Sequence, residues 1–228
     1  MSEIIFLSDV RLSFPHLVEP QKQKNELTGA ERISWNADFI MHESHPSYRQ
    51  FMARCLLLAQ NEWKDQASLV MRMIDGDKRS RCYGPGEEVI KKATMLPWDG
   101  YVGMKHIGAG RDSQPQIIQA DGSPIDPTNT MAYQQLTRKM YGGCRVNAAV
   151  KPWVQDNKFG RALRCDLVAV QFLRDDTPLG EASADASGLF GAVAAGAPAS
   201  VPSFMAAQAP AMPAAPFGAP TGLPSFMG

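Results

Sequence analysis

The stretch from Tyr141 to Trp153, YGGCRVNAAVKPW, sorts its side chains into two sets with a period of two. This is the period of a β-strand, in which successive side chains point to opposite faces. One face carries Cys144, Val146, Ala148, Val150, Pro152 and Val154, and the other carries Arg145, Asn147, Ala149, Lys151 and Trp153. Cations beside an aromatic ring can hold phosphates while a base stacks on the ring. A solvated strand also carries Lys and Arg, so that alternative stays open, and the outward Trp153 is the residue that favours a binding surface.

Two further segments combine cations with aromatic side chains. A loop after residue 77 contains several basic residues and a tyrosine, and it could wrap a nucleic-acid backbone or simply be solvated. The segment 101–107 alternates like a strand, with one aromatic and one cationic side chain predicted outward and a tryptophan just before it. The residues that we expect to contribute are Arg79, Arg81 and Tyr83 in the loop, and Trp98, Tyr101 and Lys105 at the strand.

A hairpin is predicted to bring a third group together. The turn at 156–158 joins the strand that contains Trp153 to a last strand over 159–173. Two antiparallel strands would then place Trp153, Phe159 and Arg161 around one end of the hairpin, with Arg164 slightly further along.

The elements that must position these residues are mostly strands. Extended segments are predicted over 4–14, 33–42, 68–74, 101–107, 144–154 and 159–173, with one substantial helix over 47–66. Pro15 should end the first strand, and Trp63 should lie on the buried side of the helix. Five or more extended segments without a βαβ rhythm indicate a small barrel or sandwich.

Composition limits the function classes. The chain has 228 residues with 23 basic and 23 acidic side chains, so it lacks the basic excess of a strong duplex DNA binder, and any nucleic-acid contact must be local. Its four cysteines form no CxxC pair, which argues against a zinc ribbon and a dense disulfide framework and fits a reducing cytoplasm. The absence of a basic leader and of a long apolar run predicts a protein that is neither secreted nor inserted in a membrane.

Catalytic and metal-binding patterns are weak throughout. His42 and His45 have no third and fourth ligand for a closed zinc site. The Asp75-Gly76-Asp77 segment suits a tight turn better than a cation site, and Gly108-Ala109-Gly110 lacks the third glycine and the helix of a dinucleotide site. We therefore expect no enzyme activity, no metal and no cofactor.

The composition changes near residue 180. Residues 181–228 are rich in Ala, Pro and Gly and contain only two charged side chains, so we expect a flexible tail. ProSerPheMet occurs in this tail twice. Low-complexity drift can repeat such a tetrapeptide, and a pair of docking motifs for a partner protein is the functional alternative. The residues that would dock are Phe204, Met205, Phe226 and Met227.

Five segments in order resemble one known family. These are VRLSFPHLVEP, WNADFIMH, IDGDKR, MYGGCRVNAAVKPW and FGRALRCDLVAVQFL, and together they are similar to the single-stranded DNA-binding proteins of tailed phages. The resemblance covers residues 1–180 and implies a five-stranded OB-fold barrel with elaborated loops, which coats single strands during phage replication, recombination and repair without catalysis. It also implies the cytoplasm of an infected bacterium as location and a C-terminal tail that contacts replication proteins. The tail of this chain departs from the family's acidic pattern, which puts electrostatic competition between tail and DNA in doubt.

A non-enzymatic adaptor is the competing function. In that case the barrel would be a platform and the ProSerPheMet motifs would bind the partner. Deletion of residues 181–228 separates the two functions, because DNA binding should survive in the first and partner binding should vanish in the second.

Overall fold

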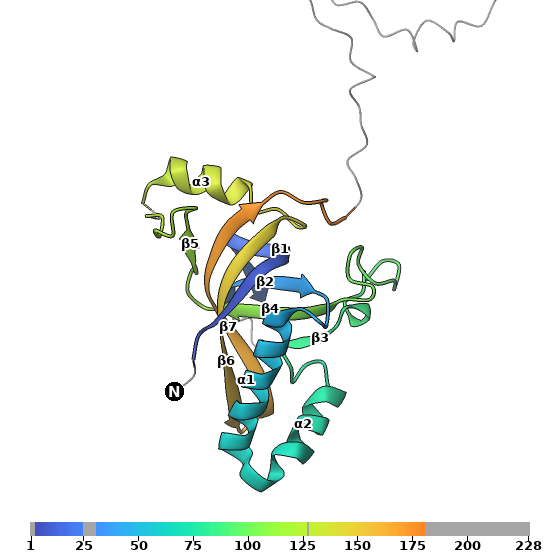
Figure 1. The fold of residues 1–228 in the computed structure, drawn as a ribbon. Coiled ribbons are helices and arrows are strands. Elements are labelled where there is room, and N and C mark those ends of the chain that lie inside the picture. The colour runs from blue at the N-terminus through green and yellow to red at the C-terminus, as the bar shows by residue number, and fades with distance from the viewer. Residues whose placement is uncertain (1–2, 25–30, 127, 181–228) are drawn as a thin grey trace, which may run out of the picture. The chain divides into compact units, whose positions relative to one another are not determined.

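The computed structural model describes residues 3–24, 31–126 and 128–180, all within the unit Met1–Ala182 (Figure 1). Their strands form a seven-stranded sheet in the order β3-β4-β2-β1-β6-β7-β5. The strands are β1 (Ile5–Lys24), β2 (Glu31–Met41), β3 (Tyr83–Pro85), β4 (Lys105–Arg111), β5 (Gln116–Ile118), β6 (Arg145–Asn157) and β7 (Gly160–Arg174). The predicted tail and its docking residues Phe204, Met205, Phe226 and Met227 lie outside the described residues.

Five of these strands make the predicted OB-type barrel. In the order β4-β2-β1-β6-β7 all neighbours are antiparallel, and the sheet curls until β4 packs against β7. No ladder joins β4 to β7 in the described sheet. Instead, the segment before β3 lies between them: the Leu163 amide donates to the Ser80 carbonyl at 2.8 Å, and the Gly108 amide donates to the Cys82 carbonyl at 2.8 Å. The barrel is thus partly open, as OB folds commonly are.

The alternation predicted for residues 144–154 is confirmed in β6. Val146, Ala148 and Val150 are buried, and the residues between them are half-exposed. The hairpin to β7 is also confirmed, with Asn157 paired to Gly160 across the turn. The inward face of β6 joins the inward faces of β1 and β2 in one apolar core.

The predicted helix is confirmed as α1 (Pro46–Trp63), which packs on β1 and β6. His45 caps it by accepting from the Ser47 amide, and Pro46 takes the first turn, where a missing N–H does no harm. The Trp63 side chain is buried as expected, and its Nε1 donates to Asp156 Oδ2 at 2.8 Å. This bond ties the end of α1 to the β6–β7 hairpin.

Residues 68–74 form a helix, so the strand predicted there is wrong. After the 3₁₀ turn η1 (Lys64–Gln66), the chain continues as α2 (Ala67–Gly76), which lies beside α1 in Figure 1. Its buried residues Ala67, Val70 and Ile74 are spaced three and four apart, which is a helical period. Residues 68–74 are apolar at most positions, and such a run fits the period of a strand as well as that of a helix. Only its packing partner decides between the two. The remaining helical elements are η2 (Gly86–Glu88) and α3 (Thr130–Arg138).

Irregular backbone changes the faces of β1. Asp9 and Phe14 have positive φ angles of 51° and 44°, and the pairing register shifts beside both of them. Ile5 and Leu7 are buried before the first irregularity and Val10 and Leu12 after it, so the buried face changes phase and Phe6 is 56% exposed. The strand also continues beyond Pro15, which was expected to end it, because pairing with β2 resumes at His16.

Candidate nucleic-acid interface

A groove of about 720 Å³ lies along the outer face of β2 and β4. In OB folds this face is the usual site for oligonucleotides. We call it the Trp153 groove. Its lining comprises Arg32, Asn36 and Asp38 of β2; His106, Gly108, Ala109, Gly110 and Arg111 of β4; Asp112 and Ser113 after β4; Arg81 and Cys82; Trp153 of β6; and Arg164, Cys165 and Asp166 of β7.

The floor of the Trp153 groove is open because two of its residues are glycines. Ile107 and Ala109 of β4 face the core, so Gly108 and Gly110 face outward. A Cβ at Gly110 would lie 3.0 Å from the Cβ of Asn36, and a Cβ at Gly108 would lie 3.0 Å from Asp38 Oδ1. Side chains at these positions would crowd β2 and fill the floor. Glycine in a strand interior is typical of places where another molecule approaches the backbone closely.

The Trp153 ring forms part of the wall and is held in place by one hydrogen bond. Its Nε1 donates to Asp166 Oδ1 at 2.7 Å. Arg164 is its cross-strand partner, and the Arg164 guanidinium donates to Gln155 Oε1 at 3.2 Å and to the Arg79 carbonyl at 2.9 Å. The hairpin therefore presents an indole and a cation side by side in one lining, which is suited to a base and its phosphate.

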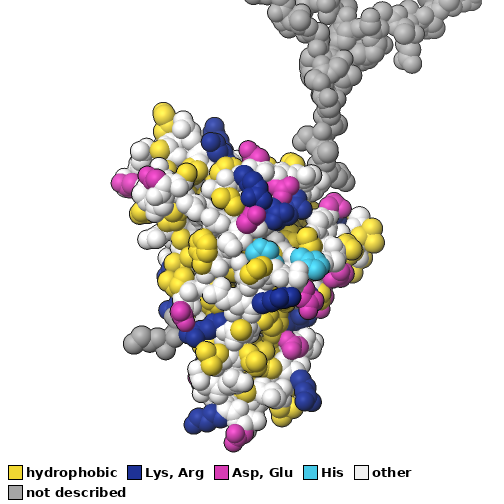
Figure 2. Space-filling view, viewed as in Figure 1, with side chains coloured by type: hydrophobic (Ala, Val, Ile, Leu, Met, Phe, Trp, Pro, Cys, Tyr) yellow, Lys and Arg dark blue, Asp and Glu magenta, His cyan; other side chains and the backbone are white. Residues whose placement is uncertain are grey.

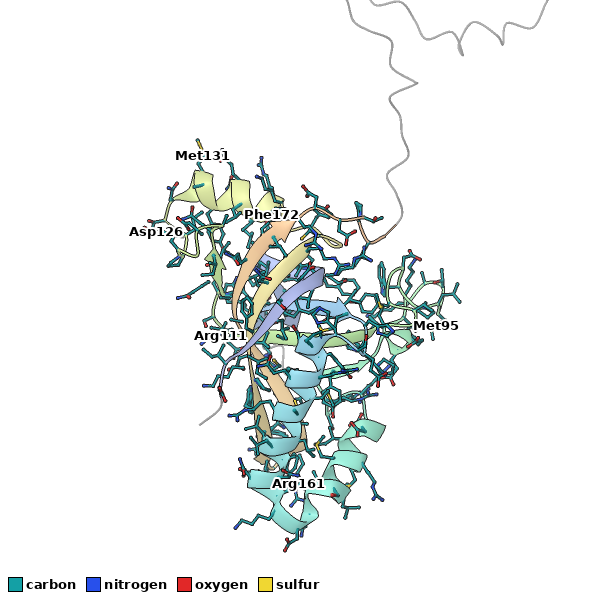
Figure 3. All side chains as sticks on the ribbon, in the orientation of Figure 1. Met95, Arg111, Asp126, Met131, Arg161 and Phe172 are labelled. Carbon is teal, nitrogen blue, oxygen red and sulfur yellow. The ribbon has the colours of Figure 1, made fainter. Side chains whose placement is uncertain are left out.

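Arg81 links the Trp153 groove to a second one of about 680 Å³, since Arg81 and His106 line both. We call the second one the Met95 groove; cations border it, and its walls are largely apolar. It is lined by Lys78, Arg79, Arg81, Tyr83, Glu88, Val89, Ile90, Lys92, Met95 and His106. In Figure 3, Arg111 marks one end of β4 and Met95 lies beyond the other, so the two grooves together follow this strand.

The guanidinium of Arg81 is mostly committed to the protein. It donates to both carboxylate oxygens of Glu88, at 2.7 and 2.6 Å, and its side chain is only 8% exposed. Both bonds come from Nη2, and this charge-assisted contact fixes the side chain where the two grooves meet. In the described part of the chain its Nε has no hydrogen-bond partner. Arg81 therefore helps to shape the boundary between the two grooves, while Glu88 balances its charge.

Asp38 and His106 are neighbours in the groove floor, with His106 Nδ1 4.0 Å from Asp38 Oδ2. Burial raises the pKa of Asp38 to about 6, partly opposed by the hydroxyl of Tyr101, which donates to Oδ2 at 3.2 Å. Burial, together with the positive charge of Arg81, lowers the pKa of His106 to about 4. At neutral pH Asp38 is therefore ionised while His106 is neutral, and the two do not form an ion pair.

Charges elsewhere are interspersed. On the face shown in Figure 2, Lys and Arg side chains are mixed with Asp and Glu and do not gather into one basic patch.

Among the described residues, no group of three or more His, Cys, Asp or Glu side chains could hold a metal ion. Within the same residues, no helix is both long and apolar enough to cross a bilayer.

A model of one protein family matches residues 3–197 of the chain. It describes the single-stranded DNA-binding protein of Enterobacter phage Enc34. The chain belongs to this family.

Individual proteins also resemble the chain. The chain is 27% identical over 172 residues to putative protein p50 of Acyrthosiphon pisum secondary endosymbiont phage 1, covering 75% of this chain and 83% of the relative. It resembles the Enc34 protein solved in complex with single-stranded DNA, with 22% identity, a TM-score of 0.56, and coverage of 78% of this chain and 89% of the other. A second structure of the Enc34 protein is 23% identical with a TM-score of 0.54, covering 81% and 88%. These two likenesses support the fold.

Several of the residues predicted from the sequence line the two grooves. Arg81, Trp153 and Arg164 line the Trp153 groove, and Arg79, Arg81 and Tyr83 line the Met95 groove. The residues predicted to meet at the end of the hairpin are spread along it, because Trp153 pairs with Arg164 and Arg161 pairs with Asp156, three positions nearer the turn. Arg161 pairs with Asp156 at 3.2 Å near the turn, and Phe159 is 79% exposed at the turn itself. In Figure 3, Arg161 lies beside α1 and α2, well away from Arg111.

The outward placement of Tyr101 is wrong. Residues 101–103 form a turn before β4, which begins only at Lys105, so the strand alternation does not reach Tyr101. Its ring is buried beside Phe14, and its hydroxyl supports Asp38. Tyr83 is also buried, because it lies on β3 and donates to Asp75 Oδ1 at 2.7 Å. Neither tyrosine offers a free ring face for stacking.

Trp98 and Lys105 lie outside the lining of both grooves. Trp98 packs edge-on against Phe14, with 5.2 Å between ring centroids, and Lys91 lies over its ring at 5.4 Å. The Lys105 ammonium pairs with Glu43 at 3.3 Å. Both side chains already have partners within the protein.

The far end of the β6 row is also engaged in internal contacts. Arg145 Nε donates to Asp176 Oδ2 at 2.6 Å, and this pairing lowers the pKa of Asp176. Asn147 donates to Gln171 Oε1 at 2.9 Å and accepts from the Asp9 amide at 3.0 Å. Lys151 stays half-exposed on the same strand face as Trp153. Arg145 and Asn147, at one end of the row, thus make contacts within the protein. Trp153, at the other end, lies in the groove.

The sequence prediction missed the floor of the Trp153 groove. Asn36 and Asp38 do lie on the outer face of the second strand, as alternation predicts, but nothing in that pattern marks this face as a binding surface. The absence of a dinucleotide motif at Gly108-Ala109-Gly110 gives no information about the face of a strand. Small residues at alternate positions after Ile107 could have indicated a strand with an open outer face.

Proposed function

We propose that residues 1–180 of this chain form a domain that binds single-stranded DNA of any sequence, without catalysis, along the Trp153 groove. Its physiological role would be to coat strands during phage DNA replication, recombination and repair, in the cytoplasm of the infected bacterium. The observation that carries the proposal is the combination of Trp153, a glycine floor and arginines along the outer face of β2 and β4 in a member of this phage family.

Stacking would supply much of the discrimination against duplex DNA. A base on an aromatic ring contributes on the order of 1 to 3 kcal/mol, and duplex bases are not free to stack on a protein. Arg32, Arg111 and Arg164 border the groove and would neutralise phosphates. For single strands each neutralised phosphate adds about 0.7 to the slope of log affinity against log salt, so a slope of about 2 is expected from three arginines.

The test replaces the groove ring. Trp153→Ala should weaken binding of a labelled single-stranded oligonucleotide by about tenfold or more, which corresponds to about 1.4 kcal/mol. Fluorescence anisotropy of the DNA measures this without relying on the protein's own tryptophans. Trp153→Phe keeps an aromatic face and should recover part of the loss.

Phe159→Ala is the matched control. It also removes an exposed aromatic ring from the same hairpin, but Phe159 does not line the groove, so the affinity should change less than threefold. An unchanged affinity in Trp153→Ala, or an equal loss in both variants, would place the DNA elsewhere on the domain.

We further propose that the tail binds a replication or recombination protein through its two ProSerPheMet copies. Paired motifs raise the effective concentration of a weak docking segment. A chain ending at residue 180 should keep its affinity for single strands and lose the partner. Loss of DNA binding on this deletion would argue against the boundary at residue 180.

A further inference from the structure

Asp38 is an acidic side chain in the floor of a groove that we expect to hold a polyanion. Two other carboxylates line the Trp153 groove, and both have positively charged or N–H partners: Asp112 lies 3.5 Å from Arg32, and Asp166 accepts from Trp153. Asp38 Oδ2 accepts a hydrogen bond from the Tyr101 hydroxyl, and Nδ1 of the neutral His106 lies 4.0 Å from the same oxygen. Its negative charge is therefore not balanced by a cation among the contacts found in the described residues.

This charge constrains how a strand can lie. A phosphate next to Asp38 would be repelled, whereas phosphates near Arg32, Arg111 and Arg164 would be attracted. A bound strand should thus turn its phosphates toward the arginines and one base edge toward the floor. A Cβ at position 108 would lie 3.0 Å from Asp38 Oδ1. Because Gly108 has no side chain, the base edge can reach this oxygen.

A carboxylate accepts hydrogen bonds and cannot donate them when ionised. Its second oxygen, Oδ2, already accepts from Tyr101. Within the described residues no side-chain hydrogen bond to Oδ1 is found, so Oδ1 can meet a base. Cytosine offers the donor N4–H₂, and carboxylates pair with it in known DNA readout. Thymine offers only N3–H, which lies between two carbonyl oxygens that would face the carboxylate.

We propose that Asp38 is a specificity-determining residue that accepts a hydrogen bond from the exocyclic amino group of one bound base and disfavours thymine at that position. The inference rests on the proposed function. It adds a preference for one kind of base at a single position of a groove in which stacking and phosphate contacts accept any sequence. One hydrogen bond to a charged group is strong enough to make this bias about tenfold.

The experiment compares oligo(dC) and oligo(dT) of equal length, both pyrimidine strands, at constant salt and pH 7.5. The wild-type chain should bind oligo(dC) about tenfold more tightly. Oligo(dU) should bind like oligo(dT), since the bias comes from the amino group and not from the thymine methyl. In Asp38→Asn the amide can both donate and accept, so the ratio should fall below about threefold and the affinity for oligo(dT) should rise. A merely structural role for Asp38 would weaken both strands together.

Two more variants sharpen the result. Asp112→Asn makes the same charge change in the same groove, but its carboxylate is exposed and pairs with Arg32, so the ratio should stay near tenfold. Gly108→Ala places a methyl group against Asp38 Oδ1 and should reduce the ratio while Asp38 is kept. A wild-type ratio near one, or an unchanged ratio in Asp38→Asn, would overturn the inference and leave the proposed function standing. Absence of binding to every strand would overturn the proposed function itself.

Discussion

Replacement of Asp38 by Asn should stabilise the protein at neutral pH. The carboxylate is held in the folded state with its pKa raised from 3.8 to about 6, because burial disfavours its charge. Between pH 3.8 and about pH 6 the Asp38 carboxyl of the folded state binds a proton more tightly than that of the unfolded state does. The contribution of Asp38 to the free energy of unfolding is therefore most favourable below pH 4 and is lost as the pH rises through 6.

The size of the effect follows from the shift. About two pKa units correspond to about 3 kcal/mol, which is the cost of keeping Asp38 ionised in the folded protein above pH 7. Asn has no charge to bury and can still accept from Tyr101, so Asp38→Asn should be more stable by up to about 3 kcal/mol at pH 7.5. At pH 4.5 the difference should shrink to about 1 kcal/mol.

The comparison must be made between variants, because His106 titrates in the same window with the opposite sign. Its lowered pKa means that the unfolded state binds the proton more tightly, so the contribution of His106 is lost as the pH falls from 6.5 toward 4. The two slopes partly cancel in the wild-type profile. Both proteins contain His106, and the difference between Asp38→Asn and wild type therefore isolates Asp38.

Urea unfolding followed by tryptophan fluorescence at several pH values from 4.5 to 7.5 gives the two free energies. Asp112→Asn serves as control, and its difference from wild type should stay near zero at every pH, since that carboxylate is 75% exposed. Lower stability of Asp38→Asn at pH 7.5, or a difference that does not change with pH, would refute the reasoning about burial.

Three other predictions concern the scaffold. Gly143→Ala should lower the free energy of unfolding, measured in urea titrations, by more than about 2 kcal/mol. The reason is that φ at Gly143 is +117° and an added Cβ would collide with the Thr177 carbonyl. Unchanged stability would show that the segment around Thr177 can move aside. Trp63→Phe should cost about 1 to 3 kcal/mol by leaving Asp156 without its indole donor, and double replacement with Asp156→Asn should cost less than the sum of the single changes. Arg145→Gln should lower the melting temperature but change the affinity for single strands less than threefold, and a tenfold loss of affinity would extend the DNA path to that end of β6.

Local periodicity predicts the type and the buried face of an element correctly where one face is buried and the other is not. The alternation in 144–154 located β6 and its inward face, and the helical spacing in 47–66 located α1. Both patterns depend on geometry within a single element, so no knowledge of the partner is needed. The same patterns failed in 68–74, where apolar residues occupy nearly every position and only packing on α1 selects the helix.

The sequence by itself determined the family, the strand-rich class and the residues available for stacking and charge neutralisation. Only the tertiary structure decided which of them share a surface. Trp153 and Arg164 line one groove because β6 and β7 pair in that register, whereas Arg145, on the same face of β6, is bound to Asp176. Asp38 lies in the site because β2 pairs with β4 in a register that places Asp38 opposite Gly108. Alternation tells which side of a strand faces out, but the contacts made there depend on residues far away in the chain.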